Sequence, residues 1–350
     1  MTVAEEIALQ VGVCRQSVSA VLNGSRNKVR QEKREQILAL AQKMNYQPNP
    51  NARSMAGRSV KTIGVIVPAY QSVISCALMN ALNREILSRG FKCYIISPQS
   101  PETEQDAIRE FSARKVDGII VCFIHNLVNY EHCPIPVVVL GARREAFDLS
   151  VDFGYGMRLA LDHLVRVHHH ERIVFLCNCI RGNESKYAVY RDFVKDHRLP
   201  ELPPLEVLEQ ENLAGYAEKL IRNEKVTAFA GSGDMVAGQF ANLLTGMGVR
   251  IPDEAALTGY DATLLCHASP LQLSAVVHPV EDLAERSVSL LFDKIASHTL
   301  SRGEPFLIRP AFFKGQTCGC PGLPQKCRIG FLQMDILRKE NPDYASFFEE

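Results

Sequence analysis

Cysteine side chains near the C-terminus are the most evident candidates for metal chemistry in this sequence. Cys318, Cys320 and Cys327 stand close together there. Zinc sites usually have C-x2–4-C spacing and four ligands, whereas this C-x-C is tighter and no histidine follows it. Free thiols are therefore the preferred interpretation, with zinc as the alternative. A second C-x-C pair, Cys177 and Cys179, would add ligands only if the fold brought the two pairs together.

Other reactive side chains do not combine into a catalytic set. The histidine run at 168–170 lies between a helical segment and a strand, and we interpret it as a solvated turn. Gly231-Ser232-Gly233-Asp234 is glycine-rich, but a dinucleotide-binding loop needs G-x-G-x-x-G and an acidic residue about 20 positions later, and this spacing fails. The sequence shows no recognisable Ser-His-Asp or Cys-His catalytic arrangement. The sequence therefore predicts a protein that is not an enzyme, with no metal site and no cofactor.

Charge is unevenly distributed along a chain that is neutral as a whole. The 350 residues include 39 Lys plus Arg and 39 Asp plus Glu. Nine basic and four acidic residues fall within positions 1–60, a net charge of +5, which leaves 30 basic and 35 acidic residues, or −5, for the rest. Since binding to duplex DNA depends on neutralising phosphates with Lys and Arg, only the first part of the chain is suited to DNA.

The basic segment has the pattern of a small helical domain. Thr2 and Glu5 have capping-box spacing, which predicts a helix start, and Gly12 ends that helix. A second helix is expected over residues 15–22. Two helices joined by a tight, glycine-containing turn form a helix-turn-helix, and a third helix over residues 32–44 would cover their core. A plain three-helix bundle with a basic surface is the alternative.

From residue 62 onward, short apolar runs alternate with segments of helical spacing. Runs that are apolar throughout suit strands buried on both faces, and their alternation with helices indicates a doubly wound, parallel α/β sheet. Helical spacing is clear over residues 77–86 and looser over 159–167. The predicted strands are residues 63–67, 91–96, 118–122, 137–140, 173–176, 227–230 and 256–258. Seven strands are too many for one small sheet, which predicts two lobes.

Ordered matches to a known family run along nearly the whole chain. The main ones are VGVCRQSVSAVLNG at 11–24, YQPNPNARSMAGR at 46–58 and IGVIVP at 63–68. Shorter ones are KVDGII at 115–120, IPVV at 135–138, RI at 172–173, TAF at 227–229, RIPD at 250–253 and TGYD at 258–261. The chain thereby resembles the lactose-repressor (LacI/GalR) family of bacterial transcription regulators. The resemblance implies an α-helical helix-turn-helix DNA-binding domain and an α/β body of two lobes with doubly wound parallel sheets, similar to periplasmic binding proteins.

The resemblance places the second helix in the DNA major groove. The base-facing residues that it implies are Arg15, Gln16 and Ala20; Arg can bridge guanine O6 and N7, and Gln can bridge adenine N6 and N7. Phosphate contacts are implied for Ser17, Ser19 and Asn23. Many relatives have Arg where this chain has Ala20, which predicts a shifted operator preference. Cys14 replaces the usual Ser at the helix cap, and Cys is a poorer cap.

A hinge segment is implied over residues 48–60. In relatives a pair of such hinge helices folds on the operator and lies in the minor groove, where an apolar side chain wedges into a base step. Met55 is the implied wedge, where Leu is commoner. The other implied contacts are Asn49, Asn51, Ala52, Arg53 and Arg58. A simple linker is the alternative interpretation.

The effector of such a regulator is expected in the cleft between the lobes, because open α/β sheets bind ligands at the carboxyl ends of their strands. The candidates are Tyr70, Gln71, Ser72 and Phe123 in the first lobe, Ser232, Asp234 and Asp261 in the second, Tyr155 and His278 on or near crossovers, and Arg191 on a helix. A structural turn is the alternative role of Asp261. Three polar contacts common in the family are altered, by Ser72-Val73-Ile74, Val189 and Ser232-Gly233, so the effector need not be an ordinary sugar.

The resemblance divides the chain into a helix-turn-helix domain (1–47), a hinge (48–60), a two-lobed effector-binding and dimerisation domain (61–318) and a C-terminal tail (319–350). It implies a homodimeric repressor that binds double-stranded operator DNA and responds to a small-molecule effector, sugar-like or other. Because the tail lacks the sustained heptads of a tetramerising coiled coil, we predict a dimer.

A secreted solute receptor is the rival from another class. It would share the two-lobed body, but it needs an export signal and no helix-turn-helix. The N-terminus has no basic region and carries Glu5 and Glu6, so we expect no signal peptide, and no apolar run reaches the roughly 18 residues of a membrane span. We therefore predict a cytoplasmic protein with reduced cysteines and no membrane partner.

Overall fold

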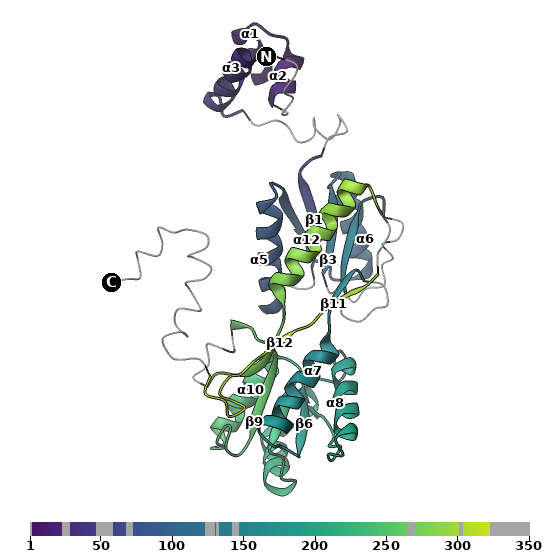
Figure 1. The fold of residues 1–350 in the computed structure, drawn as a ribbon, viewed down its shortest axis with the longest axis vertical. Helices are drawn as coiled ribbons and strands as arrows, with labels where there is room; N and C mark the ends of the chain where they lie inside the picture. Colours follow the sequence, from purple (N-terminus) through teal and green to yellow (C-terminus); the bar gives the residue numbers. More distant parts are fainter. Residues whose placement is uncertain are drawn as a thin grey trace, which may run out of the picture.

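A computed structural model describes residues 2–22, 29–46, 59–67, 73–122, 130, 133–141, 147–264, 266, 271–300 and 304–322. These residues form an N-terminal helical domain and two α/β lobes (Figure 1). None of the helices within these ranges is both long and apolar enough to cross a membrane.

The helical domain consists of α1 (Val3–Val11), α2 (Arg15–Leu22) and α3 (Gln31–Lys43). The predicted capping box at its start is confirmed: the Thr2 side chain accepts a hydrogen bond from the backbone of Glu5, and the Glu5 carboxylate accepts one from the backbone of Thr2. This exchange satisfies two of the backbone N–H groups that a helix start leaves without partners. Helix α3 begins and ends one residue before the predicted range.

The first lobe contains an all-parallel sheet of six strands in the order β11-β5-β4-β3-β1-β2. The strands are β1 (Thr62–Ile66), β2 (Lys92–Ile96), β3 (Gly118–Cys122), β4 (Val137–Gly141), β5 (Leu149–Val151) and β11 (Phe306–Ile308). Helices α5 (Val73–Ser88) and α12 (Val280–Ser297) pack side by side on one face (Figure 1). Helix α6 (Pro101–Ala113) packs through Ala107 and Phe111 on the other.

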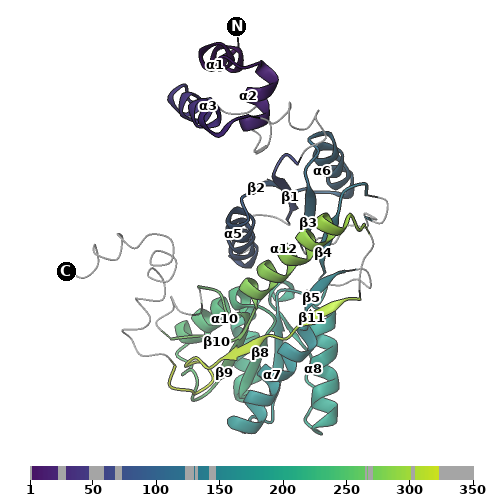
Figure 2. The ribbon, with the colours of Figure 1, turned by 45° about the horizontal axis from the view of Figure 1, so that its top comes forward.

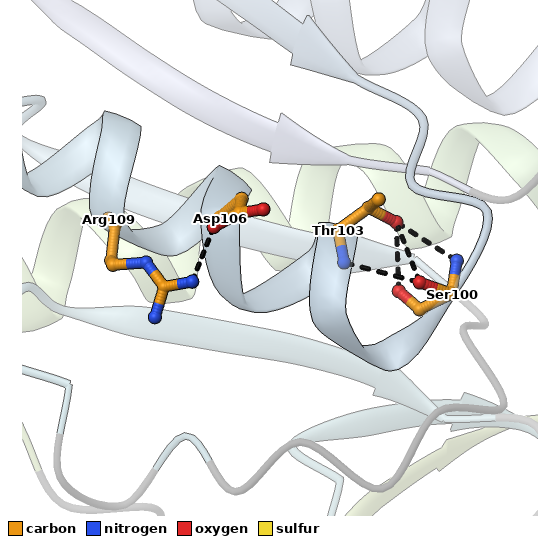
Figure 3. Close-up of polar contacts among 4 residues, drawn as sticks. All are labelled: Ser100, Thr103, Asp106 and Arg109. Atoms are coloured by element: carbon orange, nitrogen blue, oxygen red, sulfur yellow. Dashed lines mark hydrogen bonds and ion pairs between the residues drawn. The ribbon is translucent and has the colours of Figure 1, made fainter.

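The start of α6 shows how local sequence fixes a helix boundary (Figure 3). Ser100 and Thr103 exchange backbone and side-chain hydrogen bonds: the Thr103 N–H donates to Ser100 Oγ at 3.3 Å, and the Ser100 N–H donates to Thr103 Oγ1 at 2.9 Å. Pro101 at the first helical position loses no hydrogen bond there, because that N–H has no partner within a helix. An exposed ion pair between Asp106 and Arg109 follows one turn later.

The second lobe contains a six-stranded sheet in the order β12-β10-β9-β8-β6-β7, parallel except for the β10–β12 pair. The strands are β6 (Ile173–Cys177), β7 (Leu205–Glu206), β8 (Ala228–Gly231), β9 (Ala256–Asp261), β10 (Ser274–Val277) and β12 (Ala311–Phe313). One face is covered by α7 (Phe153–Asp162), which continues into the π-helix η1 (His163–Val167), and by α8 (Glu184–Asp196). The other face is covered by α9 (Leu213–Glu218), its π-helical continuation η3 (Lys219–Asn223) and α10 (Asp234–Gly246), while a 3-10 turn η2 (Val207–Glu209) follows β7.

Three chain segments cross between the lobes (Figure 2). They run from β5 into α7, from β10 into α12, and from β11 into β12. The first and third lie together, since the Asp152 N–H donates to the Ile308 carbonyl at 2.9 Å. Because these crossovers join the two sheets, the carboxyl ends of the second lobe's strands lie beside the crossovers, where a ligand would sit between lobes.

All seven predicted strands are confirmed, each to within a few residues. The five strands that the sequence did not predict, β5, β7, β10, β11 and β12, have two to four residues each. The loose helical spacing over residues 159–167 has a structural reason, because α7 becomes a π-helix at His163 and a π-turn shifts the register of the side chains that follow.

Candidate DNA-binding and effector-binding sites

The helical domain holds α2 in place through a compact apolar core. Ile7 of α1, Val18 of α2 and Ile37 of α3 are each fully buried in it. The turn between α1 and α2 depends on Gly12, whose φ of 67° is costly for residues with a Cβ. The Gly12 carbonyl accepts a hydrogen bond from Lys33 Nζ at 3.0 Å, so α3 also fixes this turn.

The exposed side of α2 carries the polar residues that sequence analysis assigned to DNA. Arg15, Gln16 and Ser19 are exposed and Ser17 is half-exposed. Arg15 forms an ion pair with Glu5 at 3.6 Å, with the two side chains 66% and 39% exposed. An exposed pair of this kind contributes little to stability, so Arg15 can exchange Glu5 for a DNA partner at small cost.

Ala20 differs from the prediction that it faces base edges. It is only 9% exposed and is one of the buried residues of α2, so its methyl group offers little surface to a base edge. At the start of α2, Cys14 Sγ and Ser17 Oγ lie 3.2 Å apart. This hydrogen bond is the main reason that the pKa of the exposed Cys14 thiol is lowered.

Several predicted contacts lie outside the residues that the structure describes. For DNA these are Asn23, Asn49, Asn51, Ala52, Arg53, Met55 and Arg58, and for the effector they are Tyr70, Gln71, Ser72 and Phe123. The described part of the candidate effector site is therefore its second-lobe half and the crossovers.

In the second lobe, polar and aromatic side chains gather at the carboxyl ends of β8, β9 and β10 and at the start of α7. His278, in the second crossover, is buried, and its Nδ1 lies 3.7 Å from Asp261 Oδ1 at the end of β9. The Phe153 ring lies 5.9 Å from the His278 ring and 6.2 Å from the Tyr260 ring. This edge offers a carboxylate, an imidazole and an aromatic face.

Lys186 on α8 completes this group, and sequence reasoning missed it. Its Nζ donates to the Ser232 carbonyl at 2.6 Å and lies 3.6 Å from the centre of the Tyr260 ring and 5.6 Å from that of Phe153. The ammonium group thus lies at the strand ends that carry Asp261. Helical periodicity offered a signal, since Lys186 precedes the buried Tyr190 and Phe193 on the inward side of α8.

Two predicted effector residues point elsewhere. Arg191 is exposed and pairs with Glu201 at 2.8 Å on the outside of α8. Asp234 is buried, and its Oδ2 accepts a hydrogen bond from the Thr263 backbone at 2.6 Å, which fixes the loop after β9. Burial is the main reason that the pKa of Asp234 is raised to about 6. Asp234 thus contacts the loop after β9 through one of its two carboxylate oxygens.

The remaining predicted residues lie at the edge or beside it. The backbone of Ser232 binds Lys186, while Tyr155, in the first turn of α7, lies with its ring 5.1 Å from the guanidinium carbon of Arg309 in the third crossover. A separate hollow of 940 Å³ is lined by Met235, Gln239 and Asn242 of α10 and by none of the residues that surround Lys186.

A second polar cluster lies elsewhere in the same lobe, in a chain for which the sequence predicted no metal site. His163, His168, Cys318 and Cys320 place one potential ligand atom each within 4.8 Å of one another. The predicted solvated turn at 168–170 is wrong for His168, which is half-buried in this cluster. Burial lowers the pKa of His163 to about 4 and raises that of Cys320 to about 11.

The fold, the exposed face of α2 and the polar edge of the second lobe define a class of protein. It has a helix-turn-helix DNA-binding domain joined to a two-lobed, ligand-binding body. Residues 4–49 match the profile of bacterial regulatory proteins of the lacI family, and residues 161–318 match that of periplasmic binding protein-like domains. The chain belongs to the lacI family of bacterial regulatory proteins. It is a DNA-binding transcriptional regulator with an effector-binding domain, in a family of proteins that are not enzymes.

Individual relatives agree with this assignment over most of their length. The chain is 25% identical over 326 residues to the HTH-type transcriptional repressor PurR of Mannheimia succiniciproducens, which covers 89% of this chain and 96% of the relative. Among solved structures, the Lac repressor dimer bound to operator and the anti-inducer ONPF superposes with a TM-score of 0.77 at 20% identity, over 91% of this chain and 99% of that one. The regulator CelR in complex with cellobiose superposes with a TM-score of 0.61 at 19% identity, over 90% and 99%. Homologues thus bind operator DNA as dimers and bind sugar-like effectors.

Proposed function

We propose that the protein is a repressor that binds a palindromic operator as a homodimer and is controlled by a small polyhydroxylated effector held between its lobes. The observation that carries this proposal is the presence, in one chain, of an exposed polar face on α2 and of a polar, aromatic edge at the strand ends of the second lobe. Two copies related by a two-fold axis would place two α2 helices in successive major grooves.

On the DNA side, Arg15 and Gln16 would read base edges, with Ser17, Ser19 and Asn23 on phosphates. The hinge at 48–60 would add minor-groove contacts through Asn49, Asn51, Ala52, Arg53 and Arg58, with Met55 as the wedge. Selection of binding sites from random duplexes tests this proposal. We expect a palindromic consensus for the wild type. Arg15→Ala should relax the base preference at one position in each half-site. A consensus without two-fold symmetry would contradict the proposed dimer on a palindromic operator.

The wedge has its own test. Met55→Gly should remove binding to the selected operator while leaving binding to random duplex DNA. The wedge adds binding free energy only at a base step that is easily deformed, and the operator supplies such a step. Ser54→Gly is the neighbouring control. Equal loss of both kinds of binding in Met55→Gly would contradict the wedge role and favour a simple linker.

On the effector side, we place the ligand against Phe153, with Asp261 accepting its hydroxyl groups and Lys186 donating to it. Tyr70, Gln71, Ser72 and Phe123 would approach from the first lobe, while Ser232, Tyr155 and His278 border the site. Control then follows from differential binding to two states of lobe closure. A screen of sugars and sugar phosphates for release or strengthening of the operator complex tests this proposal, and an effector whose action survives Asp261→Ala unchanged would contradict it.

The proposed dimer would use the solvent-facing side of α5. That helix packs on α12 through Leu78, Leu82 and Ile86, while Ala77 and Leu87 remain exposed, Leu87 at 53%. Light scattering should give twice the chain mass, and Leu87→Glu should shift the protein toward a monomer. A tetramer would overturn the proposed assembly.

A further inference from the structure

The His2Cys2 cluster, formed by His163, His168, Cys318 and Cys320, has the dimensions of a tetrahedral metal site. His163 Nε2 lies 3.1 Å from His168 Nε2 and 3.2 Å from Cys318 Sγ. Cys320 Sγ lies 3.5 Å from each histidine Nε2. Zn–N bonds of about 2.0–2.1 Å and Zn–S bonds of about 2.3 Å in a tetrahedron imply N–N separations of roughly 3.3 Å and N–S separations of roughly 3.6 Å. These four separations are close to those between zinc ligands, and all four ligand atoms lie within 4.8 Å of one another.

Backbone geometry brings the two histidines to one side of their helix. Five positions along an α-helix correspond to a rotation of about 140° beyond a full turn, which would separate the two rings. Here the π-helix η1 covers His163–Val167. A π-helix has more residues in each turn than an α-helix, so His168 lies closer to the side of the helix that carries His163. Their rings lie 4.8 Å apart, and the His163 ring also packs 4.7 Å from that of Phe312 on β12.

The Cys-Gly-Cys loop is shaped around the same point. Gly319 has a φ of 103°, and a Cβ added there would lie 3.2 Å from the His168 ring. Thr317 fixes the entry to the loop, because its Oγ1 donates to the Leu257 carbonyl and accepts from the Ser274 N–H at 2.9 Å. The Cys318 N–H donates to Ser274 Oγ at 3.1 Å. The sheet therefore holds Cys318 in position before any ion binds.

We propose that the His2Cys2 cluster binds one Zn²⁺ ion as a closed structural site. Two thiolates and two imidazoles select zinc over Mg²⁺ or Ca²⁺, which require oxygen ligands. Binding forms two Zn–N and two Zn–S bonds, and the two thiol protons pass to solvent. Four protein ligands leave no coordination position for a substrate, and Cys318 and His163 are 1% and 7% exposed, so the ion would have no catalytic access.

The zinc would join the segment after β12 to the far end of α7. His163 follows the ten residues of α7, so about 15 Å of helix separates it from Phe153 at the effector edge. The site is therefore separate from the effector edge, and its role would be to hold the segment after β12 against η1 and to stabilise the second lobe.

Metal analysis of the full-length protein, purified with a reducing agent and without chelator, tests the proposal. We expect one zinc per chain, and Co²⁺ in place of zinc should give the intense visible absorption of a tetrahedral thiolate site. Cys320→Ser and His168→Gln, both at half-buried positions, should weaken zinc binding by at least the roughly 10–100-fold that loss of an outer-shell partner causes. Two variants outside the cluster, His169→Asn and Cys179→Ser, are the matched controls and should keep wild-type affinity.

A thermal unfolding series with and without a chelator gives a second readout. The wild type and both controls should lose stability when zinc is removed, while Cys320→Ser should not respond. The proposal would be overturned by a zinc content no higher than that of Cys320→Ser, by equal Co²⁺ spectra in wild type and variants, or by a Cys318–Cys320 disulfide in protein kept reduced.

Discussion

Lys186 and Arg191 lie on the same helix, yet only Lys186 reaches the candidate effector edge. Positions 186 and 191 are separated by about 140° around an α-helix, so one faces the strand ends while the other faces solvent and Glu201. Lys186 binds a backbone carbonyl and lies over Tyr260, which pre-positions its ammonium group. A pre-positioned charge loses less side-chain entropy when a ligand binds.

Lys186 should contribute to the effector response and not to operator binding. Lys186→Met should leave operator affinity unchanged but raise the effector concentration for a half-maximal response by about 10–100-fold, as expected for loss of a charged hydrogen bond worth about 1.5–3 kcal/mol. Fluorescence anisotropy of labelled operator, titrated with effector, measures both quantities. Lys195→Met, at an exposed position of the same helix, is the control, and an equal shift in both variants would argue against a role for Lys186.

Cys14 differs from the other described cysteines in being exposed, since the others are half-buried or buried. Its hydrogen bond with Ser17 lowers its thiol pKa, whereas burial raises that of Cys93 to about 11. The thiolate is the reactive form, so at neutral pH Cys14 has the larger reactive fraction. We expect iodoacetamide to modify Cys14 before Cys93 and to block operator binding, because the adduct would stand beside Arg15 in the groove.

Mass spectrometry of peptides during a time course gives the order of modification, and gel shifts give the loss of binding. Cys14→Ser should bind operator and resist the reagent. Inactivation of Cys14→Ser at the wild-type rate would assign the effect to another thiol.

At the scale of elements, sequence patterns predicted those parts of the fold that depend on neighbours in the chain. The capping box at Thr2, the glycine turn at Gly12 and the long apolar strands all have local signals. The two-residue strand β7 and the three-residue strands β5, β11 and β12 do not, because so short a run has no period. The His2Cys2 cluster was missed for a related reason, since 155 positions separate His163 from Cys318.

Gly12 should be required for the stability of the turn between α1 and α2. Gly12→Ala should destabilise the helical domain by about 1–2 kcal/mol, the cost of a left-handed conformation for a residue with a Cβ. Hydrogen exchange of peptides from residues 2–22 in the full-length protein measures the free energy of local opening. Gly246→Ala, at the end of α10 where an added Cβ meets open space, should be neutral or stabilising. No faster exchange in Gly12→Ala would show that the turn can adopt another conformation.

A buried ion pair joins parts of the first lobe that lie far apart in the sequence. Lys294 Nζ on α12 lies 2.7 Å from Asp148 Oδ1 and also donates to the Val137 carbonyl at 2.9 Å. Asp148 Oδ2 accepts the Val139 N–H at 2.8 Å. Both charged side chains are buried, so removing one leaves the other without compensation in a poorly solvated site.

Lys294→Met should therefore lower the free energy of unfolding of this lobe by about 3–5 kcal/mol. Urea unfolding followed by circular dichroism gives the value, and Lys195→Met should stay within about 0.5 kcal/mol of wild type. A loss for Lys294→Met as small as that of the exposed control would mean that water reaches Asp148.

The uneven charge distribution should make operator binding sensitive to salt. The neutral total combines +5 over residues 1–60 with −5 over the rest, so we expect the first 60 residues to attract phosphates and the rest of the chain to repel them. Operator affinity should fall steeply with salt. A plot of log affinity against log salt concentration should have a slope of about −0.9 for each phosphate contact, so six to ten contacts in a dimer would lower the affinity by about 10³–10⁵-fold between 50 and 200 mM salt. Effector affinity, measured by calorimetry over the same range, should change far less, because Lys186 and Asp261 lie in a partly buried edge where screening is weak. A shallow slope for operator binding would show that the +5 segment does not supply the phosphate contacts assigned to it.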